Sequence, residues 1–208
     1  MSNIRVLVVE DEPLIAEDIR ETLDNIDFEV SGVAYDGDAA LHELGNNTPD
    51  IVLLDINLGS EIDGIDIAEI INKRYQIPFI YLTSYADRST VDRAKHTRPM
   101  GYIVKPFDER DLFTTLEIAL YNFSLAQPKI ELNLEHLNSK LLGKLTQKEF
   151  EILTSIFEGK TNRQMADEHY ISLNTIKTHV KNLYDKLDVH TRTQAIAKLR
   201  EMSTYHAS

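Results

Sequence analysis

Hydrophobic residues in the first 121 positions follow two alternating periods. Five short runs rich in β-branched and aromatic residues read IRVLVVE, FEVSGVAY, DIVLLDI, FIYLTS and GYIVKP. Between them, apolar residues recur at helical spacing, as at Leu14, Ile15, Ile19, Leu23 and Ile26. Runs that are apolar at consecutive positions predict strands buried on both faces, and strand–helix alternation predicts a parallel sheet covered by helices. We therefore expect a flavodoxin-like α/β domain of (βα)5 type, which ends in a helix from about Asp108 to Phe123.

The strand pattern disappears in the second part of the chain. TQKE at 146–149 has the spacing of a capping box at a helix start. Three further helices are expected at NRQMADEHY, from about Ser172 and from about Thr191. The pattern therefore predicts a small all-α domain of four helices.

A boundary separates these two parts. The stretch AQPKIELNLEHLNSKLLGK contains a proline, has mixed polarity and lacks one strong period. These features favour a linker with some helix in it. The expected division is a first domain at 1–123, a linker at 124–143 and a helical domain at 144–208.

Formal charge is distributed unevenly along the 208 residues. Residues 1–127 hold 10 Lys and Arg against 24 Asp and Glu, a balance of −14, whereas residues 128–208 hold 12 against 10, a balance of +2. This asymmetry suggests two domains with different partners. A composition of 42% apolar and 27% charged residues is that of a globular protein and excludes general disorder.

The sequence also limits the compartment and the chemistry. The absence of cysteine excludes disulfides and thiolate chemistry. No segment approaches 18 uninterrupted apolar residues, so we expect no contact with a membrane. Met1 leads into a patterned strand without a basic n-region, so we expect no export signal and a cytoplasmic protein.

Reactive groups stand where four of the expected strands end. In open α/β sheets, ligands bind outside the carboxyl ends of the strands, so these groups are expected in one crevice. Two carboxylates, a carbonyl and open positions suit Mg²⁺, which would also neutralise the repulsion within the run VEDE. The alternative is a set of solvated strand ends that hold no ligand. The groups are Glu10 and Asp11, Asp55 and Asn57, Thr83 and Ser84, and Lys105.

On VVEDE, VLLDIN, YLTS and GYIVKP, residues 4–121 resemble the receiver domain of bacterial two-component response regulators. The resemblance implies that Asp55 is the phosphoacceptor and that Lys105 contacts the phosphoryl oxygens. It assigns Thr83 to sensing the acyl phosphate and Tyr102 to an aromatic switch that rotates inward. It also implies Mg²⁺ bound by Asp11, Asp55 and the Asn57 carbonyl, with Glu10 assisting through water, and a cis peptide before Pro106.

Three segments depart from the usual receiver pattern. Leu58-Gly59 replaces the common Met-Pro, GSEIDG is one residue longer than the common loop, and HTRPMGY replaces the usual Gly-Ala before the fifth strand. These segments line the active-site loop and the output face. We expect them to affect kinetics and partner choice.

The long helix from about Ser172 carries two stripes. An apolar stripe is formed by Ile176, Val180, Leu183, Tyr184 and Leu187, and a polar stripe by Asn174, Lys177, Thr178 and Lys181. A polar stripe alone is equally typical of an ordinary solvated helix surface. A short helix, a tight turn and a helix with lysine and small polar residues in its first turns favour a helix-turn-helix motif that binds DNA.

The segment from Leu145 to Ala195 is similar to LuxR/FixJ-type DNA-binding domains, most specifically at GKTNRQMA and SLNTIKTHVKNLYDKL. The resemblance places Lys177, Thr178 and Lys181 in the major groove. It implies phosphate or backbone contacts for Thr161, Arg163 and Thr175. We interpret His179 as a packing residue or phosphate contact. Glu149 and Arg192 we interpret as structural, through helix capping and an ion pair within the domain.

Together these features predict a response regulator that controls transcription. A sensor histidine kinase or a small phosphodonor would phosphorylate Asp55, and the helical domain would bind double-stranded DNA as a homodimer when active. Such a protein is not an enzyme. One alternative is a receiver controlled by protein binding alone, which intact Asp55, Lys105 and Thr83 disfavour. Another is a Mg²⁺-dependent phosphohydrolase, which would need a second acid where this chain has Asn57.

Overall fold

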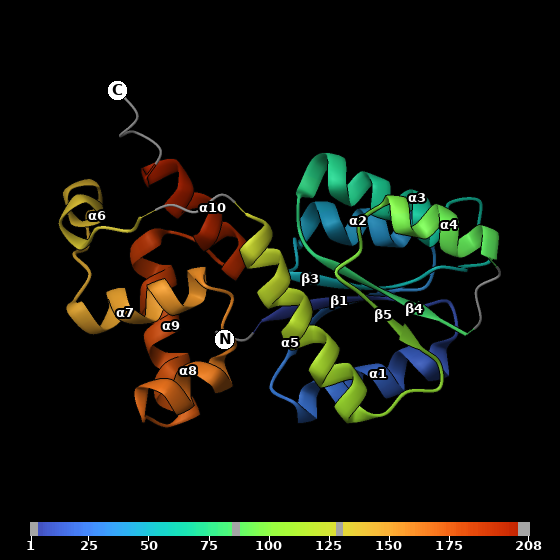
Figure 1. The fold of residues 1–208 in the computed structure, drawn as a ribbon, viewed down its shortest axis with the longest axis horizontal. Coiled ribbons are helices and arrows are strands. Elements are labelled where there is room, and N and C mark those ends of the chain that lie inside the picture. The colour runs from blue at the N-terminus through green and yellow to red at the C-terminus, as the bar shows by residue number, and fades with distance from the viewer. Residues whose placement is uncertain (1–3, 85–87, 128–130, 204–208) are drawn as a thin grey trace. The chain divides into compact units, whose positions relative to one another are not determined.

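The computed structural model describes residues 4–84, 88–127 and 131–203. Residues 128–130 of the predicted linker, and residues 1–3 and 204–208 of the predicted domains, lie outside the described residues. The chain forms two compact units (Figure 1), one from Ile4 to Leu120 and one that contains the described residues from Tyr121 onward.

The first unit contains a parallel five-stranded sheet in the order β2-β1-β3-β4-β5. Figure 1 shows α1 and α5 on one face of the sheet and α2, α3 and α4 on the other. The (βα)5 prediction is therefore confirmed. The strands are β1 (Arg5–Val9), β2 (Glu29–Ala34), β3 (Ile51–Asp55), β4 (Phe79–Thr83) and β5 (Gly101–Val104). The helices are α1 (Pro13–Asn25), α2 (Gly37–Asn46), α3 (Gly64–Ile70), the π-helix η1 (Ile71–Tyr75), α4 (Arg88–His96) and α5 (Glu109–Ala126).

Alternate residues of the central strands enter two separate cores. Val52 and Leu54 of β3 pack with α2 and α3, whereas Ile51 and Leu53 pack with α1 and α5. All five residues of β3 are buried, as expected for a strand covered on both faces. Because β1 lies between β2 and β3, its carboxyl end is the switch point at which an open α/β sheet forms a ligand crevice.

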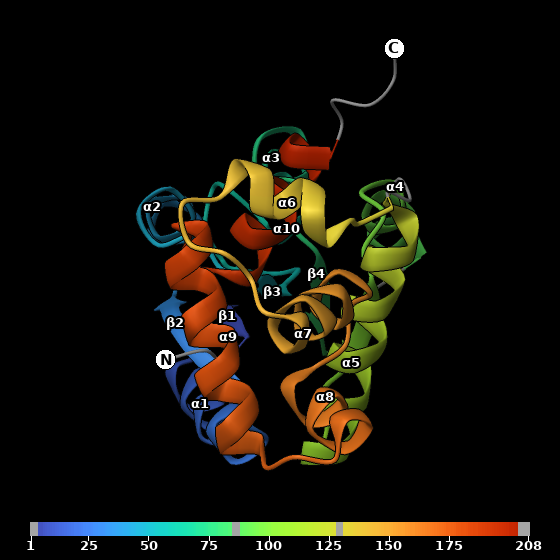
Figure 2. The same cartoon turned by 90° about the vertical axis from the view of Figure 1, so that its left-hand side faces the viewer.

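The second unit is helical, and α7 and α8 both pack against α9 (Figure 2). Three caps fix the helix starts: capping boxes at Thr146 and Thr161, and the Ser172 side chain at α9. The predicted starts near Thr146 and Ser172 are thereby confirmed. The helices are α6 (Leu134–Lys140), α7 (Gln147–Phe157), α8 (Asn162–His169), α9 (Leu173–Leu187) and α10 (Arg192–Ser203).

The segment predicted as a linker contains the end of α5 and the whole of α6. Leu137 of α6 is fully buried in the helical core, and Leu132, Leu134 and Leu141 pack partly against that core. Residues 132–141 therefore help to form the second unit, which has α6 in addition to the four expected helices. Within the described part of the chain, no helix is long and apolar enough to cross a bilayer.

Candidate functional site

Three carboxylates converge at the carboxyl ends of β1 and β3. These strands pair in parallel register, with Val9 opposite Leu54, so the residues that follow them come to the same edge of the sheet. Oxygen atoms of Glu10, Asp11 and Asp55 all lie within 4.8 Å of one another. Glu10 is fully buried, Asp55 is buried and Asp11 is partly exposed. The structure thus brings together three of the residues that the sequence predicts as one site.

Lys105 enters this crevice from the end of β5. Its Nζ atom donates to Glu10 and to Asp55 Oδ2, and it forms an ion pair with both carboxylates. Its backbone N–H donates to Thr83 O at 2.8 Å, which joins the ends of β4 and β5. The peptide bond between Lys105 and Pro106 is cis, as the resemblance implied.

The charges in this crevice change the acidity of their neighbours. Burial raises the pKa of Glu10 to about 7, and the nearby Asp55 adds to this rise, while Lys105 opposes it. Burial alone lowers the pKa of Lys105, but its hydrogen bonds to Asp55 and Glu10 outweigh that effect and hold the pKa above its usual value. The ammonium group of Lys105 therefore keeps its charge inside the crevice.

The two predicted switch residues lie on neighbouring strands. Thr83 at the end of β4 is buried, and its Oγ1 has no hydrogen-bond partner among the described residues. Such a hydroxyl is unfavourable unless a ligand or a rearrangement gives it a partner. Tyr102 on β5 is 40% exposed, and its ring centroid lies 5.5 Å from that of Tyr81.

The loop after β3 holds the side chain of Asp55, the predicted phosphoacceptor, by its backbone. The Asn57 N–H donates to Asp55 Oδ1 at 2.9 Å. Gly59 has a positive φ of 59°, and a Cβ atom there would lie 3.4 Å from Asp11 Oδ2. A Cβ atom at position 64 would lie only 2.0 Å from the Asp55 carbonyl oxygen, so only glycine fits at the start of α3. The role of Gly64 was not predicted from the sequence. Its position at the end of the acidic segment GSEIDG could have indicated it.

The residues present fit a divalent cation. Oxygen ligands from carboxylates are what Mg²⁺ prefers, and three such groups lie within 4.8 Å of one another here. Burial, with the Asp55 charge beside it, raises the pKa of Glu10 even though Lys105 is present, and a bound cation would oppose that rise.

Sequence comparison agrees with this geometry. Residues 6–117, more than half of the chain, match the response regulator receiver domain. Residues 143–199 match the bacterial regulatory proteins of the luxR family. The chain belongs to the response regulators. It combines a receiver domain with a LuxR-type DNA-binding domain.

Full-length relatives of this response regulator are found among transcriptional regulators. The transcriptional regulatory protein LiaR of Bacillus subtilis is 32% identical over 211 residues, which cover 92% of this chain and 94% of LiaR. The response regulator protein VraR of Staphylococcus saprophyticus is 30% identical over 198 residues, 93% of this chain and 94% of VraR.

Solved structures resemble the receiver domain. The signal receiver domain of a modulated diguanylate cyclase from Desulfovibrio desulfuricans G20 has 34% identity and a TM-score of 0.57, over 59% of this chain and 98% of that chain. The N-terminal domain of a response regulator/sensory box/GGDEF protein from Carboxydothermus hydrogenoformans has 30% identity and a TM-score of 0.54, again over 59% and 98%. Both similarities support the receiver fold.

The predicted DNA-binding residues of this response regulator gather mainly on α9. Ser172 caps the helix by accepting the Thr175 N–H, and the Thr178 hydroxyl donates to the Asn174 carbonyl at 3.0 Å. The opposite stripe, from Ile176 to Leu187, is buried as expected. The exposed side chains are Asn174, Thr175, Thr178 and Lys181 on α9 and Arg163 on α8, while Lys177 and His179 are half-buried.

Thr161 differs from the other predicted DNA contacts. It is 4% exposed, and its hydroxyl accepts the Gln164 N–H in the capping box of α8. The Thr161 side chain therefore caps α8, a structural role that is additional to the predicted phosphate contact.

The two residues interpreted as structural both have polar partners within the second unit. Glu149 completes the capping box with Thr146, and both of its carboxylate oxygens accept from Lys186 Nζ at 2.7 Å. Arg192 donates to the Ile156 carbonyl at 2.6 Å. Burial opposes ionisation of Glu149, but Lys186 and Thr146 together lower its pKa.

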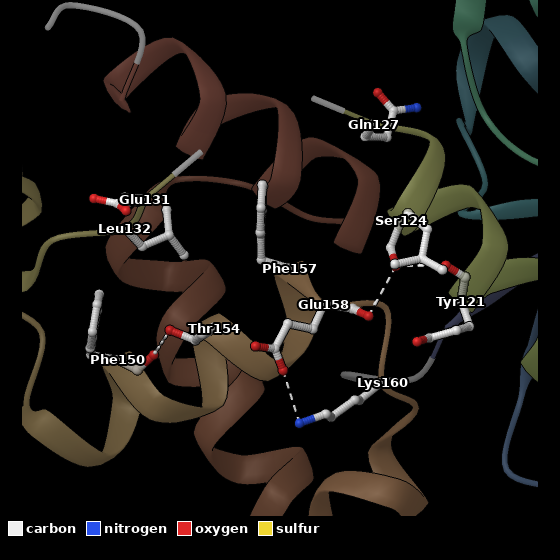
Figure 3. Close-up of a pocket in the computed structure, with 11 residues that line it drawn as sticks. Tyr121, Ser124, Gln127, Glu131, Leu132, Phe150, Thr154, Phe157, Glu158 and Lys160 are labelled. Atoms are coloured by element: carbon white, nitrogen blue, oxygen red, sulfur yellow. Dashed lines mark hydrogen bonds and ion pairs between the residues drawn. The ribbon is translucent and has the colours of Figure 1, made fainter. Parts of the chain in front are cut away.

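A hollow of about 810 Å³ lies within the second unit (Figure 3). Its walls come from the last turns of α5, from Glu131 and Leu132, and from α7. None of the predicted site residues lines it. Residues 128–130, which connect two wall residues, lie outside the described residues, so the hollow is not assigned a ligand.

Proposed function

We propose that this response regulator accepts a phosphoryl group on Asp55 and thereby regulates sequence-specific binding to DNA. The observation that carries the proposal is the pairing of Lys105 with Asp55 and Glu10 in one buried crevice, with Asp11 alongside. If these acids were only solvated strand ends, no buried ammonium group such as that of Lys105 would be needed between Glu10 and Asp55.

The two carboxylate oxygens of Asp55 have different hydrogen-bond partners, which supports different roles for them in the reaction. Oδ1 accepts the Asn57 N–H, and Oδ2 accepts from Lys105. In the proposed reaction, a carboxylate oxygen attacks the phosphorus of the donor, and the bond from phosphorus to the donor's leaving group breaks. Lys105 then balances the negative charge of the transferred phosphoryl oxygens, and the Thr83 hydroxyl donates a hydrogen bond to one of them.

A bound Mg²⁺ would supply further positive charge to the phosphoryl oxygens. We propose Asp11, Asp55 and the Asn57 carbonyl as its ligands, with Glu10 acting through water. The buried Glu10 is well placed for that indirect role because Lys105 already occupies one of its oxygens.

We also propose the partners of this response regulator and the division of its chain into domains. The phosphodonor is a sensor histidine kinase or a small acyl phosphate, and the ligand of the helical domain is double-stranded DNA, bound by a homodimer. The chain itself is a phosphoprotein and not an enzyme, and it acts in the cytoplasm. The division into a receiver at 1–123, a linker at 124–143 and a DNA-binding domain at 144–208 is part of the same proposal.

Phosphorylation is tested by mass spectrometry of the intact protein. With acetyl phosphate and Mg²⁺, wild type is expected to gain one phosphoryl group, and Asp55→Asn none. EDTA should prevent the gain. Asp24→Asn, a matched change at an exposed aspartate of α1, should leave it intact. Full incorporation into the Asp55→Asn variant would overturn the assignment.

Regulation is tested separately by DNA occupancy across the genome. Occupancy should differ between wild type and Asp55→Ala at specific sites. Identical maps would show that phosphorylation does not control DNA binding.

A further inference from the structure

Tyr81 is a buried tyrosine in the middle of β4, two residues before Thr83. Its side chain is fully buried in the core between the sheet and α3, where its ring meets that of Phe79 edge-on at a centroid distance of 5.3 Å. Because side chains alternate along a strand, Tyr81 and Thr83 face the same side of the sheet. An apolar residue would fill this position without the cost of burying a hydroxyl.

The Tyr81 hydroxyl is paired with Thr97, which directly follows α4. The two oxygen atoms lie 2.9 Å apart, and Thr97 is also buried. The Thr97 hydroxyl donates its only proton to the Ala94 carbonyl at 2.6 Å. It must therefore accept from Tyr81, whose pKa burial raises well above the usual value, so that the phenol keeps its proton.

This bond fixes the end of α4 to the sheet. The Thr97 carbonyl accepts in turn from Asn72 in η1 at 2.5 Å, so the same residue also joins α4 to the end of α3. A second link between these elements, the ion pair of Arg93 with Asp63, has side chains that are 57% and 31% exposed. Exposed pairs contribute little, so the buried Tyr81–Thr97 bond is the stronger anchor.

Tyr81 also supports the aromatic switch residue. Tyr81 and Tyr102 are register partners on β4 and β5, and their rings are in tilted contact. The ring of Tyr81 is therefore part of the surface against which the Tyr102 ring lies. One side chain thus contacts Tyr102 and holds the end of α4.

We propose that Tyr81 is a positioning residue of the switch: its hydroxyl, through Thr97, and its ring, against Tyr102, stabilise the arrangement of α4 described above against the alternative arrangement that phosphorylation favours. The inference rests on the proposed function, since it concerns how phosphorylation of Asp55 reaches the surface of the receiver. Removal of the hydroxyl should shift the unphosphorylated protein toward the alternative arrangement.

The test compares full-length wild type, Tyr81→Phe, Thr97→Val and the double variant. Hydrogen exchange of the amides from residue 88 to 98 is measured first without a phosphodonor. Tyr81→Phe should exchange about threefold to tenfold faster there, the range expected from loss of one buried hydrogen bond. Thr97→Val should exchange at least as fast as Tyr81→Phe, because it also loses the bond to the Ala94 carbonyl, and the double variant should exchange little faster than Thr97→Val. Tyr35→Phe, which removes a half-exposed hydroxyl, is the control.

The second measurement repeats the exchange with acetyl phosphate and Mg²⁺. The change caused by phosphorylation in residues 88–98 should be smaller in Tyr81→Phe than in wild type, because the variant already populates the alternative arrangement. Tyr81 is not a positioning residue if that change is equal in both proteins, or if Tyr81→Phe speeds exchange evenly across the receiver. If wild type gains no phosphoryl mass, the proposed function fails, and the first measurement alone decides whether Tyr81 anchors α4.

Discussion

The carboxylate crevice of the receiver and the polar face of α9 are built in opposite ways. In the crevice, Lys105, Glu10 and Asp55 are buried and fix one another through ion pairs. On α9, Asn174 and Lys181 are exposed, and only the period of the helix places them on one face. Buried polar groups must find partners within the protein, whereas exposed groups are already satisfied by water.

This difference determines what a substitution can reveal. A change in the crevice disturbs interactions that exist before any ligand arrives, so it should alter stability and pH dependence as well as chemistry. A change on the α9 face should leave the free protein nearly unaltered and appear only when DNA is present.

Lys105→Met should have the largest effect on chemistry. The rate of phosphoryl transfer from acetyl phosphate should fall by about a hundredfold or more, the usual cost of losing one group that stabilises transferred charge. Time-resolved intact-mass spectra measure the rate, and circular dichroism checks the fold. Lys95→Met, at an exposed lysine of α4, should react like wild type. Equal rates for the two variants would remove Lys105 from the site.

Titration of Glu10 should make the metal-free receiver less stable as pH rises. The folded pKa of about 7 lies above the ordinary 4.5, so the folded state binds more protons between these values. This contribution to the free energy of unfolding is present below pH 4.5 and is lost as pH rises through 7. Its total is at most about 3 kcal/mol.

Glu10→Gln isolates this contribution. In EDTA, urea unfolding at several pH values should show that wild type loses stability relative to Glu10→Gln between pH 4.5 and 7. Mg²⁺ should reduce the slope, because a cation favours the carboxylate. If the free energies of unfolding of the two proteins changed in parallel with pH, the pKa of Glu10 would not be raised in the folded state.

Substitutions on α9 should act only on the complex with DNA. Lys181→Ala should cost about 1–3 kcal/mol of binding free energy and relax base preference at one position if Lys181 reads a base edge. If it contacts phosphate alone, binding should weaken evenly across sequences, and the salt slope should fall by about 1. Affinity for operator and scrambled DNA at several salt concentrations separates these outcomes.

Lys144→Ala is the matched control for charge. Lys144 is exposed, and its carbonyl accepts from Lys186, near the opposite end of α9 from Asn174. It should affect affinity less than Lys181→Ala does. Equal effects of the two changes on every DNA would show that α9 attracts DNA only by net charge.

The same contrast explains which features the sequence alone could predict. Strands β1, β3 and β4 were predictable because their apolar residues are consecutive, whereas β2 reads EVSGVA and is mostly half-buried. The order of the strands at one edge of the sheet gathers Glu10, Asp55 and Lys105. The sequence could not show that one Lys105 ammonium serves both carboxylates, because that depends on distances across the crevice. Nor could it show the approach of Gly64 to the Asp55 carbonyl, because that depends on the path of a loop.

Short elements were predicted less well than long ones. Helix α6 has only seven residues and would be unstable in isolation. It forms because Asn133 caps it and Leu137 is buried against other helices. The predicted linker lacked a strong helical pattern because contacts with the rest of the second unit, rather than a long amphipathic repeat, hold this helix in place.

Thr161→Ala should have the smallest effect on stability and on DNA binding. It tests a residue that is both a buried helix cap and a predicted phosphate contact. As the buried N-cap of α8, Thr161 should contribute about 1 kcal/mol to the free energy of unfolding, which Thr161→Ser should largely retain. A residue that only caps the helix would leave the salt slope of DNA binding unchanged in both variants. A lower slope for Thr161→Ala, measured with Thr161→Ser as the control, would show that the hydroxyl also contacts the phosphate backbone. The contrast between buried structural groups and exposed DNA contacts would then break down at this residue.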